Sequence, residues 1–164
     1  MNHKVFVGIG SNINKEQNIQ SCIKLFKKEF QEINISPVYE TQSMGFKGDN
    51  FFNCVCSFDT TKDIYQLKSF LSEIEQEHGR NLNEEKFSSR TLDIDILYFD
   101  DLVLDKDKIQ IPRKEILEFD FVLVPLNDLN PDFIHPVLRQ SHESIMKEDK
   151  FEKLILEKVY LDFT

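Results

Sequence analysis

The order of strand-like and helix-like segments is the feature of this sequence that most constrains its fold. Apolar residues recur at every second position in some segments and at every third or fourth position in others, which distinguishes strands from amphipathic helices. The predicted elements are a strand at 4–9, a helix covering 19–30, strands at 33–41 and 51–58, a helix at 62–78 and a strand at 91–99. This β-α-β-β-α-β order predicts an α+β fold of ferredoxin-like type, an α/β sandwich with helices packed on a mainly antiparallel sheet.

The segments that follow this core are shorter. They are a polar hairpin that continues into 109–112, helical material from 112 to 129, a helix near 139–148 and a closing strand at 154–161. Pro37 has no N–H to donate, so the strand at 33–41 is expected to be an edge strand or to carry a bulge. With 164 residues and no repeat or linker, residues 1–164 are predicted to form a single domain.

Charge and composition exclude some classes of partner. A net charge of −9 argues against a nucleic-acid-binding protein, which would show a basic face. A small polyphosphate remains compatible, because Mg²⁺ and a few basic side chains reverse the sign of the charge within one cleft. No apolar run has the length of a membrane span, and the first residues resemble a strand rather than a signal peptide. We therefore expect small-molecule substrates, no nucleic acid and no membrane partner.

The three cysteines, Cys22, Cys54 and Cys56, suit a reducing compartment, and we expect a cytoplasmic protein. Cys54 and Cys56 lie two positions apart in a predicted strand and point to one face, which is poor geometry for a disulfide between them. We interpret them as small core residues. The sequence contains no obvious coiled coil, so a monomer is the default expectation.

The strand at 91–99 holds the main candidate for chemistry. Alternation places Leu92, Ile94, Ile96 and Tyr98 on one face, and Asp93, Asp95, Leu97 and Phe99 on the other. The two carboxylates then lie side by side, roughly 6–7 Å apart at Cα. Two charges beside apolar neighbours are costly to bury without a positive partner, and two hard cations that bridge phosphate oxygens would supply one.

The alternative is that Asp93 and Asp95 form the polar face of an exposed strand, and Asp-x-Asp alone does not decide between the two. An EF-hand loop is excluded, because Leu97, Tyr98 and Leu104 occupy positions that need a ligand, a glycine and a glutamate. Arg90 favours the phosphate reading, since its fork of donors suits phosphate and it directly precedes this strand.

Other candidates are weaker individually. Gly8 and Gly10 lack the third glycine of a dinucleotide fingerprint and are typical of a tight turn. Phe51 and Asn53 share a strand face, where a ring could stack on a flat heterocycle while the amide bonds its edge. Glu75 lies at the border of a helix's apolar stripe, where a solvated carboxylate is the default.

Taken in order, these segments resemble one known family. The matching motifs are Gly10-Ser11-Asn12, Phe51-Phe52-Asn53, Glu75, Gly79-Arg80, residues 89–96, Ile111-Pro112-Arg113, residues 121–126 and His135-Pro136. In order and spacing they resemble the 6-hydroxymethyl-7,8-dihydropterin pyrophosphokinases of folate biosynthesis, over residues 4–137. The most specific motif is Arg-Thr-Leu-Asp-Ile-Asp-Ile at 90–96.

The resemblance implies a Mg²⁺-dependent enzyme that transfers pyrophosphate from ATP, its co-substrate, to the pterin hydroxymethyl oxygen and releases AMP. It implies two Mg²⁺ ions on Asp93 and Asp95, which would act in catalysis with Arg80 and Arg90. The implied pterin-binding residues are Thr41, Ser43, Met44, Phe51, Asn53 and Phe121. The implied ATP-binding residues are Glu75, Arg80, Arg90, Ile96, Lys108 and Arg113.

Some positions depart from the family pattern. Arg113 stands where the family usually has a histidine, and Phe119 stands where an arginine is typical. Leu82 and Phe87 replace an arginine and a tryptophan of the polar loop. Arg113 can still reach phosphate, whereas the other replacements reduce the charge available around ATP. The departures leave open a divergent paralogue. Two further alternatives are a two-metal nucleotidyltransferase and a non-catalytic ferredoxin-like binding module.

Overall fold

A mainly antiparallel sheet forms the centre of the computed structural model, which describes residues 1–43, 48–79 and 91–164. Its strands are β1 (His3–Ser11), β2 (Ile33–Ile35), β3 (Val38–Thr41), β4 (Phe51–Thr60), β5 (Asp93–Phe99) and β8 (Ile155–Val159). The order across the sheet is β5-β1-β4-β3-β8, and β2 pairs with β4 beside β3. The predicted ferredoxin-like arrangement is confirmed, with β8 added beyond β3.

Pro37 divides the predicted strand at 33–41 in two. Ser36 and Pro37 separate β2 from β3, and both strands pair with β4. Beside the break, the Ser36 N–H donates to the Val55 carbonyl, and the Ser36 hydroxyl accepts from the Val55 N–H, each at 2.9 Å. The serine side chain therefore replaces the backbone partner that the ladder loses at this point.

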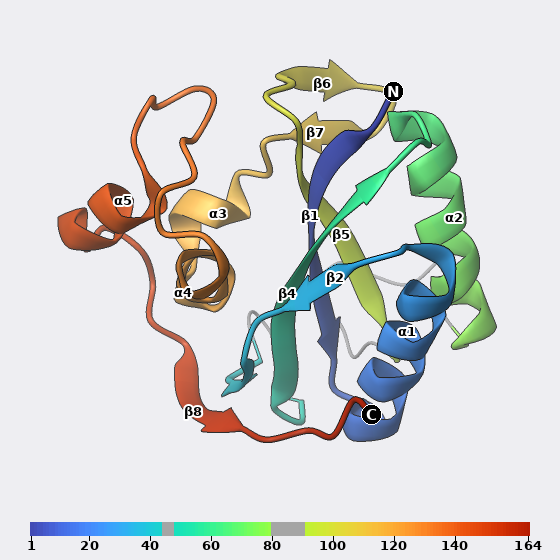
Figure 1. Ribbon diagram of the computed structural model, residues 1–164. Coiled ribbons are helices and arrows are strands. Elements are labelled where there is room, and N and C mark those ends of the chain that lie inside the picture. The colour runs from blue at the N-terminus through green and yellow to red at the C-terminus, as the bar shows by residue number, and fades with distance from the viewer. Residues whose placement is uncertain (44–47, 80–90) are drawn as a thin grey trace.

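Helices α1 (Lys15–Glu29) and α2 (Ile64–Glu77) cover one face of the sheet (Figure 1). A capping box starts α2, in which the Asp63 carboxylate accepts the N–H groups of Tyr65 and Gln66. The helix stops before Gly79, whose φ of +90° is accessible to glycine without strain. No helix in the described ranges combines the length and the apolar composition needed to cross a membrane.

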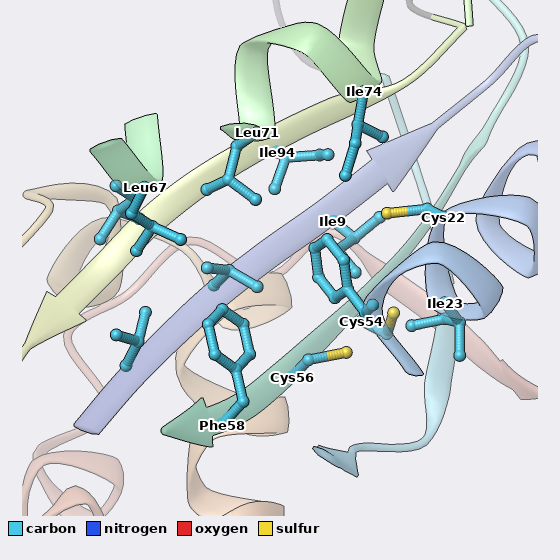
Figure 2. Packing of buried hydrophobic residues seen from close by; sticks show 14 of the residues in the cluster. Ile9, Cys22, Ile23, Cys54, Cys56, Phe58, Leu67, Leu71, Ile74 and Ile94 are labelled. Atoms are coloured by element: carbon cyan, nitrogen blue, oxygen red, sulfur yellow. The ribbon is translucent and has the colours of Figure 1, made fainter. Parts of the chain in front are cut away.

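The space between these helices and the sheet is filled by apolar side chains (Figure 2). Leu67, Leu71 and Ile74 of α2 meet residues of β1, β4 and β5 there. Cys22, Cys54 and Cys56 are buried and free, which confirms them as core residues. Their labelled side chains lie among the aliphatic and phenyl groups in Figure 2.

Three further helices lie on the other side of the sheet: α3 (Glu115–Glu118), α4 (Asp120–Leu129) and α5 (His142–Glu148) (Figure 1). A small hairpin of β6 (Leu104–Lys106) and β7 (Ile109–Ile111) precedes them. The side chains between α3–α5 and the sheet form a second core, distinct from the first core under α1 and α2. This second core contains buried polar groups. The Tyr98 hydroxyl lies 3.0 Å from His142 Nε2, while His142 Nδ1 lies 2.8 Å from the Asn130 carbonyl. Burial lowers the pKa of His142, so the ring stays neutral within this network.

The predicted alternation of residues 91–99 is right up to Leu97 and wrong beyond it. The pairing of β1 with β5 shifts between Phe6 and Val7, so that Leu97 is an extra residue opposite β1. Leu97 and Tyr98 consequently both pack in the second core, and Phe99 returns to the first. A bulge of this kind depends on the partner strand, which the sequence of 91–99 alone does not reveal.

Candidate active site

Three of the candidate positions, Asp93, Gly10 and Asn53, lie on one face of the sheet, the face covered by α3–α5. Ile9 and Cys54 point into the first core, so Gly10 and Asn53, their neighbours along β1 and β4, face the other way. The strand register pairs Gly10 with Asp93 on one side and with Asn53 on the other. Asp93, Gly10 and Asn53 therefore form a row across three adjacent strands, which we call the site row.

Strand spacing fixes the dimensions of the site row. Neighbouring strands lie about 4.8 Å apart, so Asp93 and Asn53 are separated by about 10 Å at Cα. Gly10 between them contributes no side chain, and a Cβ added there would lie 2.6 Å from Asn53 Oδ1. Gly10 has no side chain of its own, so the space above it admits the Asn53 amide, which extends over β1 toward the carboxylate end.

At the carboxylate end, Asp93 and Asp95 point to the same face as predicted. The Asp95 side chain is 42 % exposed, so the pair lies at the edge of the core rather than within it. Partial burial and the adjacent charge of Asp93 raise the pKa of Asp95 to about 7, which Arg113 partly opposes. The pair thus carries an unfavourable concentration of negative charge that a bound cation would relieve.

Arg113 is the described cation closest to this pair. Its Nη2 lies 3.9 Å from Asp95 Oδ1. Glu115 orients the guanidinium by accepting from Nε at 3.1 Å and from Nη2 at 3.2 Å. The departure from the family's histidine therefore places a permanently charged, oriented group beside the carboxylates, where it can contact a phosphate.

A cleft of about 210 Å³ opens beside β5, between α2 and the β6–β7 hairpin. Its lining contains Asp93, Asp95 and the predicted ATP-binding residues Glu75, Ile96, Lys108 and Arg113. These predicted ATP-binding residues therefore line one cleft together with the carboxylate pair. Glu75 is not simply a solvated helix carboxylate, since its Oε2 accepts the N–H of Ile94 at 2.8 Å on the outer side of β5.

Lys68 is a further lining residue that sequence reasoning missed. Its Nζ donates to the Lys108 carbonyl at 2.9 Å, which ties α2 to the hairpin and places a second ammonium group near the cleft. The available signal was its position two helical turns before Glu75, which puts both residues on one side of α2. That signal is weak, because solvated lysines occupy such positions in most helices.

At the amide end, Asn53 Nδ2 donates to Thr41 Oγ1 at 2.8 Å. This bond orients the amide so that Oδ1 lies toward Gly10. Ser43 is the last described residue before a gap, and its hydroxyl lies 3.4 Å from the Gly48 carbonyl. Phe121 lies in the first turn of α4, and its ring stacks on Phe119 with centroids 5.3 Å apart.

Several predicted residues lie outside the described part of the chain. They are Met44, Arg80 and Arg90, together with the departures Leu82 and Phe87. Phe119, by contrast, is described. It is 9 % exposed and packs against Phe121, so the replacement of the family's arginine adds an apolar support for Phe121 at the cost of a charge.

The donor set fits Mg²⁺ better than a metal held wholly by protein. In residues 1–43, 48–79 and 91–164, no group of three or more acidic, histidine or cysteine side chains is arranged to hold a metal. Mg²⁺ commonly takes one or two carboxylates and completes its octahedron with water and substrate phosphates. Asp93 and Asp95 supply that number of carboxylates, and both line the cleft beside β5.

The comparison with known families shows which family this chain belongs to. A family model described as 7,8-dihydro-6-hydroxymethylpterin-pyrophosphokinase matches residues 6–131. The chain belongs to this family. The pyrophosphokinase match contains the whole site row, the cleft and Phe121.

Curated relatives agree with the pyrophosphokinase assignment. The 2-amino-4-hydroxy-6-hydroxymethyldihydropteridine pyrophosphokinase of Aquifex aeolicus is 33 % identical over 149 residues, which cover 88 % of this chain and 91 % of the relative. The folic acid synthesis protein FOL1 of Dictyostelium discoideum is 36 % identical over 139 residues, 84 % of this chain and 21 % of its own length. The chain thus spans about a fifth of the longer FOL1 protein.

Solved structures support the fold of the pyrophosphokinase family. An HPPK-DHPS crystal structure in complex with substrates gives a TM-score of 0.74 at 15 % identity, covering 91 % of this chain and 44 % of that chain. The Plasmodium falciparum HPPK-DHPS with pteroate gives 0.72 at 14 % identity, covering 91 % and 42 %. At such low identities the likeness shows the architecture alone.

Proposed function

We propose that this chain transfers the terminal diphosphate of ATP to 6-hydroxymethyl-7,8-dihydropterin, forming the pterin diphosphate and AMP in folate biosynthesis. The observation that carries the proposal is the site row. It joins a carboxylate pair beside a cleft to an oriented amide on β4, with Gly10 between them and about 10 Å between the Cα atoms of Asp93 and Asn53. That spacing suits a phosphate chain that links a nucleotide at one end to a heterocycle at the other.

The pterin would be read at the amide end. Asn53 offers a donor and an acceptor to the edge of a flat heterocycle, and its bond to Thr41 restricts its rotation. Phe51 and Phe121 would stack on the two faces of the ring, with Ser43 and Met44 offering further polar groups. The hydroxymethyl group would then point along the row toward Asp93.

ATP would occupy the cleft at the other end. Ile96 would contact the base or ribose, while Lys108 and Arg113 would face the phosphates with Arg80 and Arg90. Glu75 would act on this side too, through the Ile94 N–H that it holds. Asp93 and Asp95 would hold two Mg²⁺ ions, which supply charge neutralisation along the triphosphate when bound.

In this arrangement the pterin hydroxyl oxygen forms a bond to the β-phosphorus and its proton is released to solvent. The bond from that phosphorus to the α–β bridging oxygen breaks, so that AMP leaves with that oxygen. The chain's own side chains orient the two substrates and compensate charge, and no covalent enzyme intermediate is needed. The proposal therefore assigns positioning to Asn53 and Thr41, and charge compensation to Arg113 and Lys108.

The spacing of the motifs along the chain does not exclude a nucleotidyltransferase. Gly10 and Asp93 are far apart in sequence, yet they are register partners on neighbouring strands. The reaction products distinguish the three candidate functions instead. A nucleotidyltransferase releases diphosphate, the proposed enzyme releases AMP only when the pterin is present, and a binding module releases neither.

The test is an assay of AMP formation with ATP, Mg²⁺ and 6-hydroxymethyl-7,8-dihydropterin. We expect pterin-dependent AMP that disappears when Mg²⁺ is chelated, and a loss of about a hundredfold or more in Asp95→Ala. Asp101→Ala is the matched control, because Asp101 is an exposed carboxylate just after the other end of β5. Pterin-independent AMP, or full activity in Asp95→Ala, would reject the proposal.

We further propose that the protein acts as a monomer in the cytoplasm, on small molecules and without nucleic acid or membrane. The three buried free cysteines and the net charge of −9 support this setting. Light scattering coupled to size-exclusion chromatography tests the oligomeric state, and a mass of two chains would contradict it.

A further inference from the structure

We propose that Asp120 and the backbone of Glu152, Leu154 and Ile155 form a clamp that sets the position of Phe121 relative to Thr41. We call this set the C-terminal clamp. It gives a role in pterin binding to the chain segment that follows residue 139. The inference rests on the proposed function, because it concerns the two sides of the proposed pterin site.

The first half of the clamp holds the start of α4. Asp120 is 5 % exposed, and its Oδ1 and Oδ2 accept the N–H groups of Leu154 at 2.9 Å and Ile155 at 3.0 Å. The Asp120 N–H donates to the Glu152 carbonyl at 2.9 Å, and the Glu152 N–H donates to Glu118 at 2.7 Å. Four hydrogen bonds therefore fasten the residues beside Phe121 to the C-terminal segment.

The second half of the clamp holds β3. Ile155, which bonds to Asp120, is the register partner of Thr41 in the pairing of β3 with β8. The Leu154 carbonyl accepts the N–H of Gln42 at 3.0 Å. Leu154 and Ile155 therefore contact both Asp120, which precedes Phe121 in the chain, and the β3 segment that carries Thr41.

A continuous set of contacts thus connects the two sides of the proposed pterin site. It runs from Phe121 through Asp120 to Leu154 and Ile155, and from there to Thr41, whose hydroxyl orients Asn53. Both carboxylate oxygens of Asp120 bond to backbone of the C-terminal segment, and α4 has no side-chain cap at Phe119. A charge-assisted bond to two N–H groups is short and directional, so it restricts the distance between the elements that it joins.

The purely structural alternative is that Asp120 only fastens the C-terminal segment. Asp63 provides a matched comparison, because its carboxylate also accepts two backbone N–H groups, at 2.9 and 2.8 Å, but at the start of α2 on the opposite face. Loss of either carboxylate should destabilise the fold. Only loss of Asp120 should change the spacing of the pterin site.

The experiment is isothermal calorimetry of 6-hydroxymethyl-7,8-dihydropterin with Mg²⁺ and a non-hydrolysable ATP analogue present, and of the analogue with Mg²⁺ alone. We expect Asp120→Ala to weaken pterin binding by about tenfold or more, and nucleotide binding by less than about twofold. Asp120→Asn retains one acceptor and should give an intermediate loss. Asp63→Ala should lower the melting temperature and leave pterin affinity within about twofold of wild type.

The outcomes separate the clamp from the proposed function. Wild-type protein that binds the nucleotide but no pterin would overturn the proposed function and the clamp together. Pterin affinity unchanged in Asp120→Ala, or weakened equally in Asp63→Ala, would overturn the clamp alone. If Asp120→Ala does not fold, Asp120→Asn decides the question, and an affinity equal to wild type would overturn the clamp.

Discussion

The two faces of the central sheet are built from the same strands but differ in chemistry. The face under α1 and α2 is packed with aliphatic, phenyl and thiol groups (Figure 2). The face under α3–α5 combines apolar packing with buried polar groups, among them Tyr98, His142 and Asp120. Each of these three makes a hydrogen bond to a group distant in the sequence.

This difference shows how a small sheet divides two tasks. Uniform apolar burial on the first face stabilises the fold and needs no directional contacts. The second face carries the site row, so it must hold polar side chains in fixed orientations, and it can do so because their partners compensate for lost hydration. Alternation along each strand makes the division possible within β4, where Phe58 faces one side and Asn53 the other.

The largest effect that should separate the two faces is on stability. Phe58 is 1 % exposed, stacks on Phe30 with centroids 3.8 Å apart, and lies at the far end of β4 from Phe51. Phe58→Ala should lower the free energy of unfolding by about 3–5 kcal/mol, because it leaves a cavity in a close-packed core. Urea denaturation measures the loss, and calorimetry on the remaining folded protein should show pterin and nucleotide affinities near wild type.

A matched surface variant sharpens this first prediction. Tyr65 is 46 % exposed on α2, so Tyr65→Ala should change stability by less than about 1 kcal/mol. A large loss of pterin affinity in folded Phe58→Ala would break the proposed division between the faces.

The next effect is on the site row. Gly10→Ala places a Cβ 2.6 Å from Asn53 Oδ1, so the amide must move away from the position that its bond to Thr41 favours. We expect pterin affinity to fall about tenfold, which is about 1.4 kcal/mol. Gly8→Ala is the control on the same face, because its Cβ would meet Leu97 at an ordinary 3.6 Å. Equal losses of pterin affinity in both variants would show that Asn53 is not the group affected.

The smallest effect concerns pH and the carboxylate pair. The pKa of Asp95 is raised from 3.8 to about 7 in the folded chain. Between about pH 4 and 7, Asp95 therefore keeps its proton in the folded chain and has lost it in the unfolded chain. The stability contributed by this group therefore falls as the pH rises through that interval. Asp95→Asn avoids the loss, so without Mg²⁺ or nucleotide it should be more stable than wild type at pH 8 and equal to it at about pH 4.

Denaturation curves at several pH values measure this difference, with Asp101→Asn as the exposed control. If the free energy of unfolding changes with pH in the same way in wild type and Asp95→Asn, the unfavourable negative charge assigned to the pair is contradicted. We expect Asp95→Asn to raise the free energy of unfolding at pH 8 and Phe58→Ala to lower it. Substitutions on the two faces would then change stability in opposite directions in the same assay.

Short-range patterns predicted much of this protein. Strand alternation placed Asp93 beside Asp95, and Phe51 on one face with Asn53, because successive side chains of a strand point to opposite sides. Helical periodicity located α1 and α2. The motif order indicated the family that the comparison later confirmed.

The same patterns missed contacts between distant segments. Sequence reasoning assigned no partner to Glu75, and the structure bonds it to the Ile94 N–H. It read Phe119 only as a lost charge, although its ring supports Phe121. It also continued the alternation past Leu97, where the register with β1 introduces a bulge.

The sequence by itself determined the order of the main strands and helices, the apolar side of most of them, and which side chains are able to hold metal, phosphate or a heterocycle. These properties follow from periodicity and from side-chain chemistry, both of which are local. Only the tertiary structure decided that Gly10 lies between Asp93 and Asn53, and that Asp120 reaches Leu154 and Ile155. Strand register and the packing of α4 result from the burial of the whole core, so no short segment contains the information that specifies them.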